Sequence, residues 1–187
     1  MGVLIGFIPF IVFALLAGVS MSLALWLALA AAFVVGIRDF LHSKALRVLD
    51  VGGMALFVFM ALFIGFVEPG LKESTTRLVI DCGFLLMAGV SLIRRDPVTL
   101  GYAREFAPPE SWTQPAFIRA NYIVTGVWTF AFAITALFDG IANFDNTFSQ
   151  TIEISAGLAA LVVAIAFTAR YRALAPVQVR RPAALRW

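Results

Sequence analysis

The sequence has little from which a disulfide, a metal centre or a haem site could be built. It contains one cysteine, Cys82, and one histidine, His42, among 187 residues. A single cysteine excludes an intrachain disulfide, and zinc or iron–sulfur sites need several Cys or His ligands at short spacings. A haem held between two axial histidines of one chain is excluded as well. We therefore predict no metal site and no cofactor.

Charge is also scarce. Only 13% of the residues are charged, whereas 61% are hydrophobic, and the mean hydropathy is +0.95. A soluble domain carries about 25% charged residues, so this chain cannot supply a polar surface of the usual size. No positively charged segment precedes the first apolar run, and we expect that run to belong to the mature protein and not to a cleaved signal peptide. Lipid must be the solvent for most of the chain.

The few charged residues divide the sequence into apolar segments of membrane-spanning length. Residues 2–37 contain no charge, and this segment is too long for one ordinary span. Gly18-Val19-Ser20 favours a turn that would make it a hairpin, and one long tilted helix is the alternative. We predict an all-α polytopic transmembrane helical bundle of six spans, or five if residues 2–37 form one helix. The expected spans are about 3–18, 21–37, 51–67, 77–93, 120–138 and 151–169.

The cationic residues are distributed unevenly among the predicted loops. Only Lys72 and Arg77, of the 14 Lys and Arg residues, fall on one side of the expected bundle. The others fall in the connection between spans two and three, in the loop 94–119 and after span six. Cytoplasmic loops of membrane proteins are enriched in Lys and Arg. We therefore predict a multi-pass protein of a bacterial inner (cytoplasmic) membrane with a cytoplasmic C-terminus.

The cytoplasmic loop 94–119 is the longest polar segment. Within it, Arg94-Arg95 is followed by Asp96-Pro97, which is typical of the start of a helix because Asp caps a helix and Pro fits its first turn. The double proline Pro108-Pro109 would end such a helix. We expect one short helix between these two points.

That short helix is predicted to be amphipathic. Val98, Tyr102 and Phe106 would form one apolar stripe, which suits a helix lying among lipid headgroups. Trp112 follows at a position typical of an interfacial indole. The loop is either a docking surface for a partner or a connector that lies on the membrane.

The C-terminal segment, with the basic tail 171–187, holds five arginines from Arg170 onwards and no acid. Anionic headgroups attract such segments by about 1 kcal/mol per cationic residue. We predict that Arg180, Arg181 and Arg186 bind a lipid surface. No other feature resembles a nucleic-acid module, so no nucleic-acid partner is expected.

Two acids are predicted inside spans. Asp81 and Glu153 each lie about one turn from the outer end of their helices, where Arg77 could pair with Asp81 at i−4. A carboxylate inside a membrane is costly and is a functional candidate, so these are the possible transport-site acids. No further acid or base follows them inward along the expected spans. The outer acids form either a cation-attracting vestibule or the complement of the positive-inside bias: Glu68, Glu73, Asp81, Asp139, Asp145 and Glu153.

Three segments resemble the bacterial intracellular septation protein A family and its relatives without assigned function. They are Phe7-Ile8-Pro9-Phe10 in the first hairpin, the loop from Arg94-Arg95-Asp96-Pro97 to Pro109 and Trp112, and Asn121 with Trp128 and Phe130 at the next span. The resemblance implies an inner-membrane protein that acts by protein contacts in cell-envelope maintenance or division. It implies no catalytic residues. The candidates for partner or interfacial contacts are Arg94, Arg95, Asp96, Pro97, Tyr102, Phe106, Trp112, Asn121 and Trp128.

The sequence leaves two functions open. One is this contact function, with membrane-protein partners or other copies of the chain beside anionic lipid. The other is a small transporter or channel for a cation or another small solute, with Asp81 and Glu153 in its path. A membrane enzyme has the least support, because no nucleophile–base pair or metal constellation is present.

Overall fold

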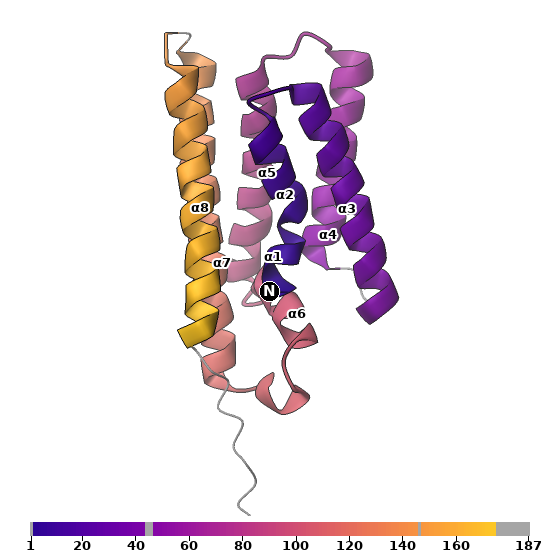
Figure 1. The fold of residues 1–187 in the computed structure, drawn as a ribbon, viewed down its shortest axis with the longest axis vertical. Coiled ribbons are helices and arrows are strands. Elements are labelled where there is room, and N and C mark those ends of the chain that lie inside the picture. The colour runs from indigo at the N-terminus through magenta and orange to yellow at the C-terminus, as the bar shows by residue number, and fades with distance from the viewer. Residues whose placement is uncertain (1, 44–46, 146, 175–187) are drawn as a thin grey trace, which may run out of the picture.

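The computed structural model describes residues 2–43, 47–145 and 147–174, and these residues form helices without any strand (Figure 1). The predicted all-α polytopic membrane bundle is confirmed. Five helical segments within this part of the chain are long and apolar enough to cross a membrane. They comprise α3 (Met21–Ser43), α4 (Val48–Leu62) with its π-helical extension η1 (Phe63–Val67), α5 (Glu73–Ile93), α7 (Pro115–Phe144) and α8 (Gln150–Leu174).

The N-terminal segment is a hairpin, and the alternative of one long helix is wrong. Two short helices, α1 (Gly2–Gly6) and α2 (Ile8–Leu16), are followed by a turn at 17–20, after which α3 runs back alongside α2 (Figure 1). The break at Phe7 precedes Pro9, which lies in the first turn of α2, where its missing N–H is tolerated. This first arm is shorter than the five long helices and lies inside the bundle, where it contacts α8 as well as α3.

Each long helix packs against the long helices that come before and after it in the sequence. Helix α4 lies between α3 and α5, and α7 lies between α5 and α8 (Figure 1). A further short helix, α6 (Val98–Glu105), and the 3₁₀ turn η2 (Pro109–Ser111) connect α5 to α7. The first arm reaches the long helices through its side chains, since Phe10 of α2 packs against Phe84 of α5 and Phe132 of α7.

Aromatic side chains fill the middle of this core. Phe7 stacks on Trp128 with ring centroids 3.8 Å apart, and Phe10 meets Phe132 edge to face at 4.8 Å. Phe84 packs against both Phe10 and Phe132. These rings are almost fully buried, and they separate the two ends of the bundle by an apolar layer.

The two ends differ in charge. We call one the acidic end: it carries the turn 17–20, the connection 68–72 and the connection between α7 and α8, at the top of Figure 1. The other, the basic end, carries the connection between α3 and α4, α6 with η2, and the C-terminal end of α8. The structure thus brings the Arg-rich segments to one end, as the predicted topology requires. Residues 180, 181 and 186 of the predicted lipid-binding tail lie outside the described residues.

The short helix α6 caps the basic end of the bundle. It begins at Val98, with Pro97 as its N-terminal neighbour, and it packs against α1, α5 and α7. Val98 and Tyr102 are buried, and Phe106 is exposed. The predicted lipid-facing stripe is therefore wrong for its first two members, because the ends of the neighbouring helices cover this face of α6.

Candidate functional site

Four ionisable side chains from three helices meet near the acidic end. Arg77 and Asp81 lie one turn apart on α5, Asp139 lies on α7 and Glu153 on α8. Each is at most 8% exposed. We call these four residues the acidic-end cluster. The helical spacing of Arg77 and Asp81 puts both on one face of α5, and the packing of α7 against α5 and α8 brings the other two acids to that face.

The strongest ion pair in the cluster crosses between helices. Arg77 donates from Nε and Nη2 to Oε1 of Glu153, at 3.1 and 2.6 Å. Its Nε also lies 3.6 Å from Oδ1 of Asp139, and its Nη1 lies 3.8 Å from Glu73. The sequence predicted that Arg77 could pair with Asp81 along α5. The closest pair is instead with Glu153, because α8 is packed close enough to present its acid.

Asp81 and Asp139 face each other. The Asp81 carboxyl is within hydrogen-bonding reach of Asp139 and of Thr135, one turn from Asp139 on α7. Two ionised carboxylates in such contact repel each other. With one guanidinium among three buried carboxyls, the acidic-end cluster has an excess of negative charge that a proton or a cation must offset.

Three buried polar atoms have no hydrogen-bond partner in the part of the chain that the structure describes. They are Oγ of Ser74, Nη1 of Arg77 and Oδ2 of Asp139. All three belong to the acidic end. Buried polar groups are nearly always hydrogen-bonded, so an unpartnered group indicates a water, an ion or a ligand at that position. Two of these atoms are donors or can donate, and the third is a carboxyl oxygen.

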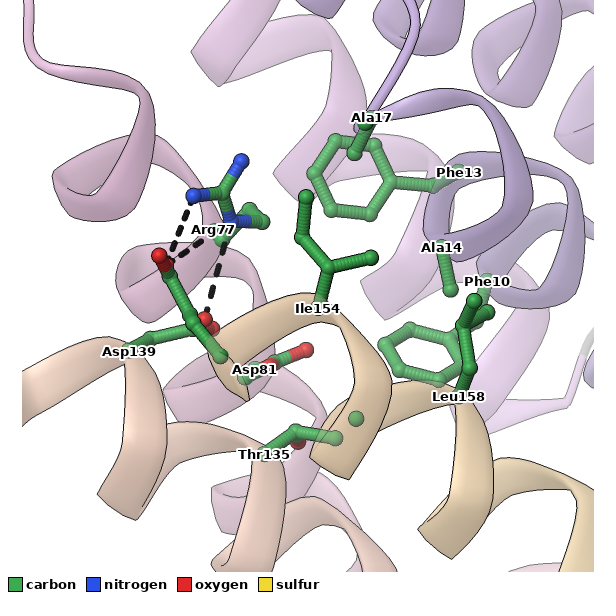
Figure 2. A pocket seen from close by; sticks show the side chains of 13 residues that line it. Phe10, Phe13, Ala14, Ala17, Arg77, Asp81, Thr135, Asp139, Ile154 and Leu158 are labelled. Carbon is green, nitrogen blue, oxygen red and sulfur yellow. Dashed lines mark hydrogen bonds and ion pairs between the residues drawn. The ribbon is translucent and has the colours of Figure 1, made fainter. Parts of the chain in front are cut away.

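Two cavities lie beside the cluster. The inner cavity, about 40 Å³ in volume, has Arg77, Asp81, Thr135 and Asp139 on one side and Phe10 and Phe13 on the other (Figure 2). The outer cavity is about 270 Å³ in volume and is shared among α5, α7, α8 and their connections. Arg77 and Glu153 line both cavities, so their ion pair separates an outer polar space from an inner space with an aromatic wall.

Asp145 contributes a further negative charge to the outer cavity. The hydroxyl and the backbone N–H of Thr147 both donate to its Oδ1, at 2.6 and 2.8 Å. These hydrogen bonds favour the carboxylate and lower the pKa of Asp145 from its usual value. The outer cavity thus carries a permanent negative charge at its exposed rim.

A second cluster of charges lies at the basic end. Arg47 contacts Asp39 through Nη1 and donates from Nη2 to Glu105 at 3.0 Å. The Tyr102 hydroxyl donates to Asp50, and the Arg47 guanidinium lies 4.2 Å from the centre of the Tyr102 ring. Burial and the negative charge of Asp50 raise the pKa of Tyr102. We call these five residues the basic-end cluster.

The predicted contact residues divide into two groups. Arg94, Arg95, Asp96, Phe106 and Trp112 are exposed. Arg104 lies over the Trp112 ring at 5.9 Å. The buried members pack inside the protein and cannot touch a partner in this conformation: they are Pro97, Tyr102, Asn121 and Trp128.

Part of each cluster was not predicted from the sequence. A span was expected to end at residue 138, just before Asp139, but α7 continues to Phe144, so this acid lies within the helix with its side chain buried. Asp39, Arg47 and Asp50 were assigned to a loop and its borders, but two of them lie within α3 and α4. These residues could have been placed in helices if each helix had been expected to continue beyond the end of its apolar segment. The prediction that only two acids, Asp81 and Glu153, lie inside spans is therefore wrong, because Asp139 is a third.

Comparisons with models of protein families, with curated proteins and with solved structures found no match. The resemblance to the septation protein A family therefore stays a prediction from the sequence. What the geometry defines is a helical membrane protein with a buried charged site beside two cavities.

Proposed function

We propose that the protein carries a small solute across a bacterial inner membrane and that the acidic-end cluster is its binding site. The observation that supports this most directly is the position of Arg77, Asp81, Asp139 and Glu153. They are buried between membrane helices, include two unpartnered polar atoms and line a cavity. Ionisable groups inside membrane helices are costly and typically mark substrate or ion pathways.

Helix packing alone gives no reason for such a site. A buried ion pair is often replaceable by apolar residues without loss of stability. In addition, Asp81 and Asp139 face each other, and two ionised carboxylates in contact repel. The free-energy cost of burying these four residues is explained if the cluster binds a proton or a solute.

The proposed orientation follows from the charges of the two ends. The positive-inside rule places the basic end in the cytoplasm, and the C-terminal end of α8 with it. The cavities then lie on the outer side of the aromatic layer, and the Arg77–Glu153 ion pair lies between the inner and the outer cavity. The short arm α1–α2 supplies Phe10 and Phe13 to the cavity wall, and we propose that it moves when the site changes sides.

Transport is tested with the full chain in proteoliposomes. Uptake of radiolabelled ethylammonium, rubidium ion and glycine covers an organic cation, a metal cation and a zwitterion. At least one should enter faster than into empty liposomes, and Asp81→Asn should reduce that rate at least tenfold. Glu68→Gln is the matched control, because Glu68 is an exposed acid at the same end. Uptake of all three at the rate of empty liposomes contradicts the proposal.

The second candidate is the contact function in cell-envelope maintenance or division that the family resemblance implies. The exposed group Arg94, Arg95, Asp96, Phe106 and Trp112 supports it, since these residues project from one connection at the basic end. If it is correct, Phe106→Ala with Trp112→Ala should reduce recovery of membrane-protein partners or of a second copy by affinity purification. Asp81→Asn should then leave that recovery unchanged.

A further inference from the structure

We infer that Asp81 and Asp139 form a proton-for-amine exchange site: the pair holds one proton when empty and releases it when a small organic ammonium ion binds. This inference rests on the proposed transport function and names its substrate class and its coupling ion.

Charge within the cluster divides into two unequal parts. Arg77 makes both of its short contacts with Glu153, which gives a nearly neutral pair. Asp139 has Arg77 only at 3.6 Å. The remaining two carboxyls, those of Asp81 and Asp139, lie within hydrogen-bonding reach of each other and share with Glu153 the single positive charge of Arg77. One added positive charge, as a proton or as a bound cation, is what this pair lacks.

The unpartnered oxygen of Asp139 specifies what kind of cation fits. Apart from a proton shared with Asp81, its Oδ2 has no hydrogen-bond donor among the described residues, and the side chain is 7% exposed. An ammonium group supplies N–H donors and a positive charge together. The described residues contain no group of three or more His, Cys, Asp or Glu side chains arranged to hold a metal ion. The acceptor oxygens of this site therefore favour an ammonium group, which donates hydrogen bonds, over a bare metal cation.

The opposite wall of the inner cavity suits the rest of such a molecule. Phe10, Phe13, Ile154 and Leu158 line it (Figure 2). Aromatic faces attract organic cations, and apolar side chains accept an alkyl group. The volume of about 40 Å³ limits the substrate to a few heavy atoms. A short primary alkylammonium has this size and this division into a charged head and an apolar tail.

The exchange balances in atoms and charge. In the empty site one carboxyl of the pair carries the proton on oxygen and the other is a carboxylate. When the ammonium ion binds, the O–H bond breaks, the proton leaves to the outer cavity, and the ammonium N–H groups donate to the two carboxylates. One positive charge replaces another, so the net charge of the cluster is unchanged. No oxidant, reductant or further reactant takes part.

Proton release on binding is the direct test. Ethylammonium chloride is added to the full chain in weakly buffered detergent solution, and a pH indicator records the protons released. We expect about one proton per ligand bound. Tetramethylammonium chloride at the same concentration controls for ionic strength and has no N–H donor, so it should release none. Equal release with both salts, or no release with ethylammonium, overturns the inference.

Variants test whether the pair is the source of the proton. Asp139→Asn and Asp81→Asn should each reduce both proton release and ethylammonium binding at least tenfold, while Glu68→Gln keeps both. Circular dichroism and a single size-exclusion peak establish that each variant is folded. Unchanged release in both folded Asn variants contradicts the inference.

The outcomes also separate this inference from the proposed function. Proton release by ethylammonium without uptake into proteoliposomes supports the exchange site and opposes transport. Uptake of ethylammonium without proton release supports transport and overturns the exchange. Uptake of rubidium ion or glycine but not of ethylammonium likewise keeps the transport function and overturns the amine assignment.

Discussion

The acidic-end and basic-end clusters contain the same kinds of residues but differ in how well their members are paired. At the basic end, Asp39 and Glu105 contact Arg47, and Asp50 accepts the hydroxyl of Tyr102. At the acidic end, three carboxyls share one buried arginine, and the unpartnered buried atoms of the described residues all lie there. A complete network stabilises one structure, whereas an incomplete one is available to a ligand. This difference supports the proposal that the basic-end cluster is structural and that the acidic-end cluster binds a ligand.

The largest expected effect comes from breaking the complete network. Arg47→Met should lower the free energy of unfolding by about 2–3 kcal/mol, because Asp39 and Glu105 lose their closest guanidinium and keep only that of Arg38, which is partly exposed. Thermal unfolding in detergent measures this loss. Arg94→Met is the matched control, since Arg94 is exposed at the same end, and it should change stability by less than about 0.5 kcal/mol. Equal effects of the two variants would remove the structural role.

The two clusters should also differ in the sign of the stability change when one aspartate of each is replaced by asparagine. Asp139→Asn should raise the free energy of unfolding by about 1 kcal/mol, because the neutral amide donates to Asp81 without the proton that the acid pair must take up from water on folding. Asp50→Asn should lower it by about 1–2 kcal/mol, because the bond from the Tyr102 hydroxyl loses its charge assistance.

Thermal unfolding of both variants in the same detergent measures these shifts. A stability loss of similar size in both would mean that the acidic-end cluster is as structural as the basic one. Losing substrate binding while gaining stability is the pattern expected of a functional residue.

The smallest effect concerns pH at the basic end. The pKa of Tyr102 is raised by burial and by Asp50, so the folded protein holds this proton at a pH where the unfolded chain releases it. Stability from this group is complete below about pH 10, the ordinary tyrosine pKa, and is lost as pH rises above it.

Titration by tyrosine absorbance should therefore show fewer ionised tyrosines in the native than in the denatured protein. Tyr102→Phe should reduce that difference by one tyrosine. A native and a denatured titration that coincide would show that the hydroxyl of Tyr102 is accessible to water.

Several features were predictable because they depend on local sequence. The long apolar helices follow from hydropathy and length, as in α5 and α8, whose predicted spans lie within the observed helices. The hairpin turn at Gly18-Val19-Ser20 follows from residues that tolerate turns. The concentration of Lys and Arg at one end was likewise predictable, because it depends only on which predicted loops contain these residues.

The tertiary structure decided which of these residues meet. Glu153 lies 76 residues after Arg77 in the chain, yet it is the acid nearest to that guanidinium. Tyr102 has the spacing of a lipid-facing residue, but the ends of neighbouring helices cover it and supply Asp50 as its partner. Hydropathy and charge are properties of each segment's own residues. They predict which segments enter the membrane and in which direction. Ion pairing depends on distances of a few ångströms between helices, and only the packing of the bundle sets those distances.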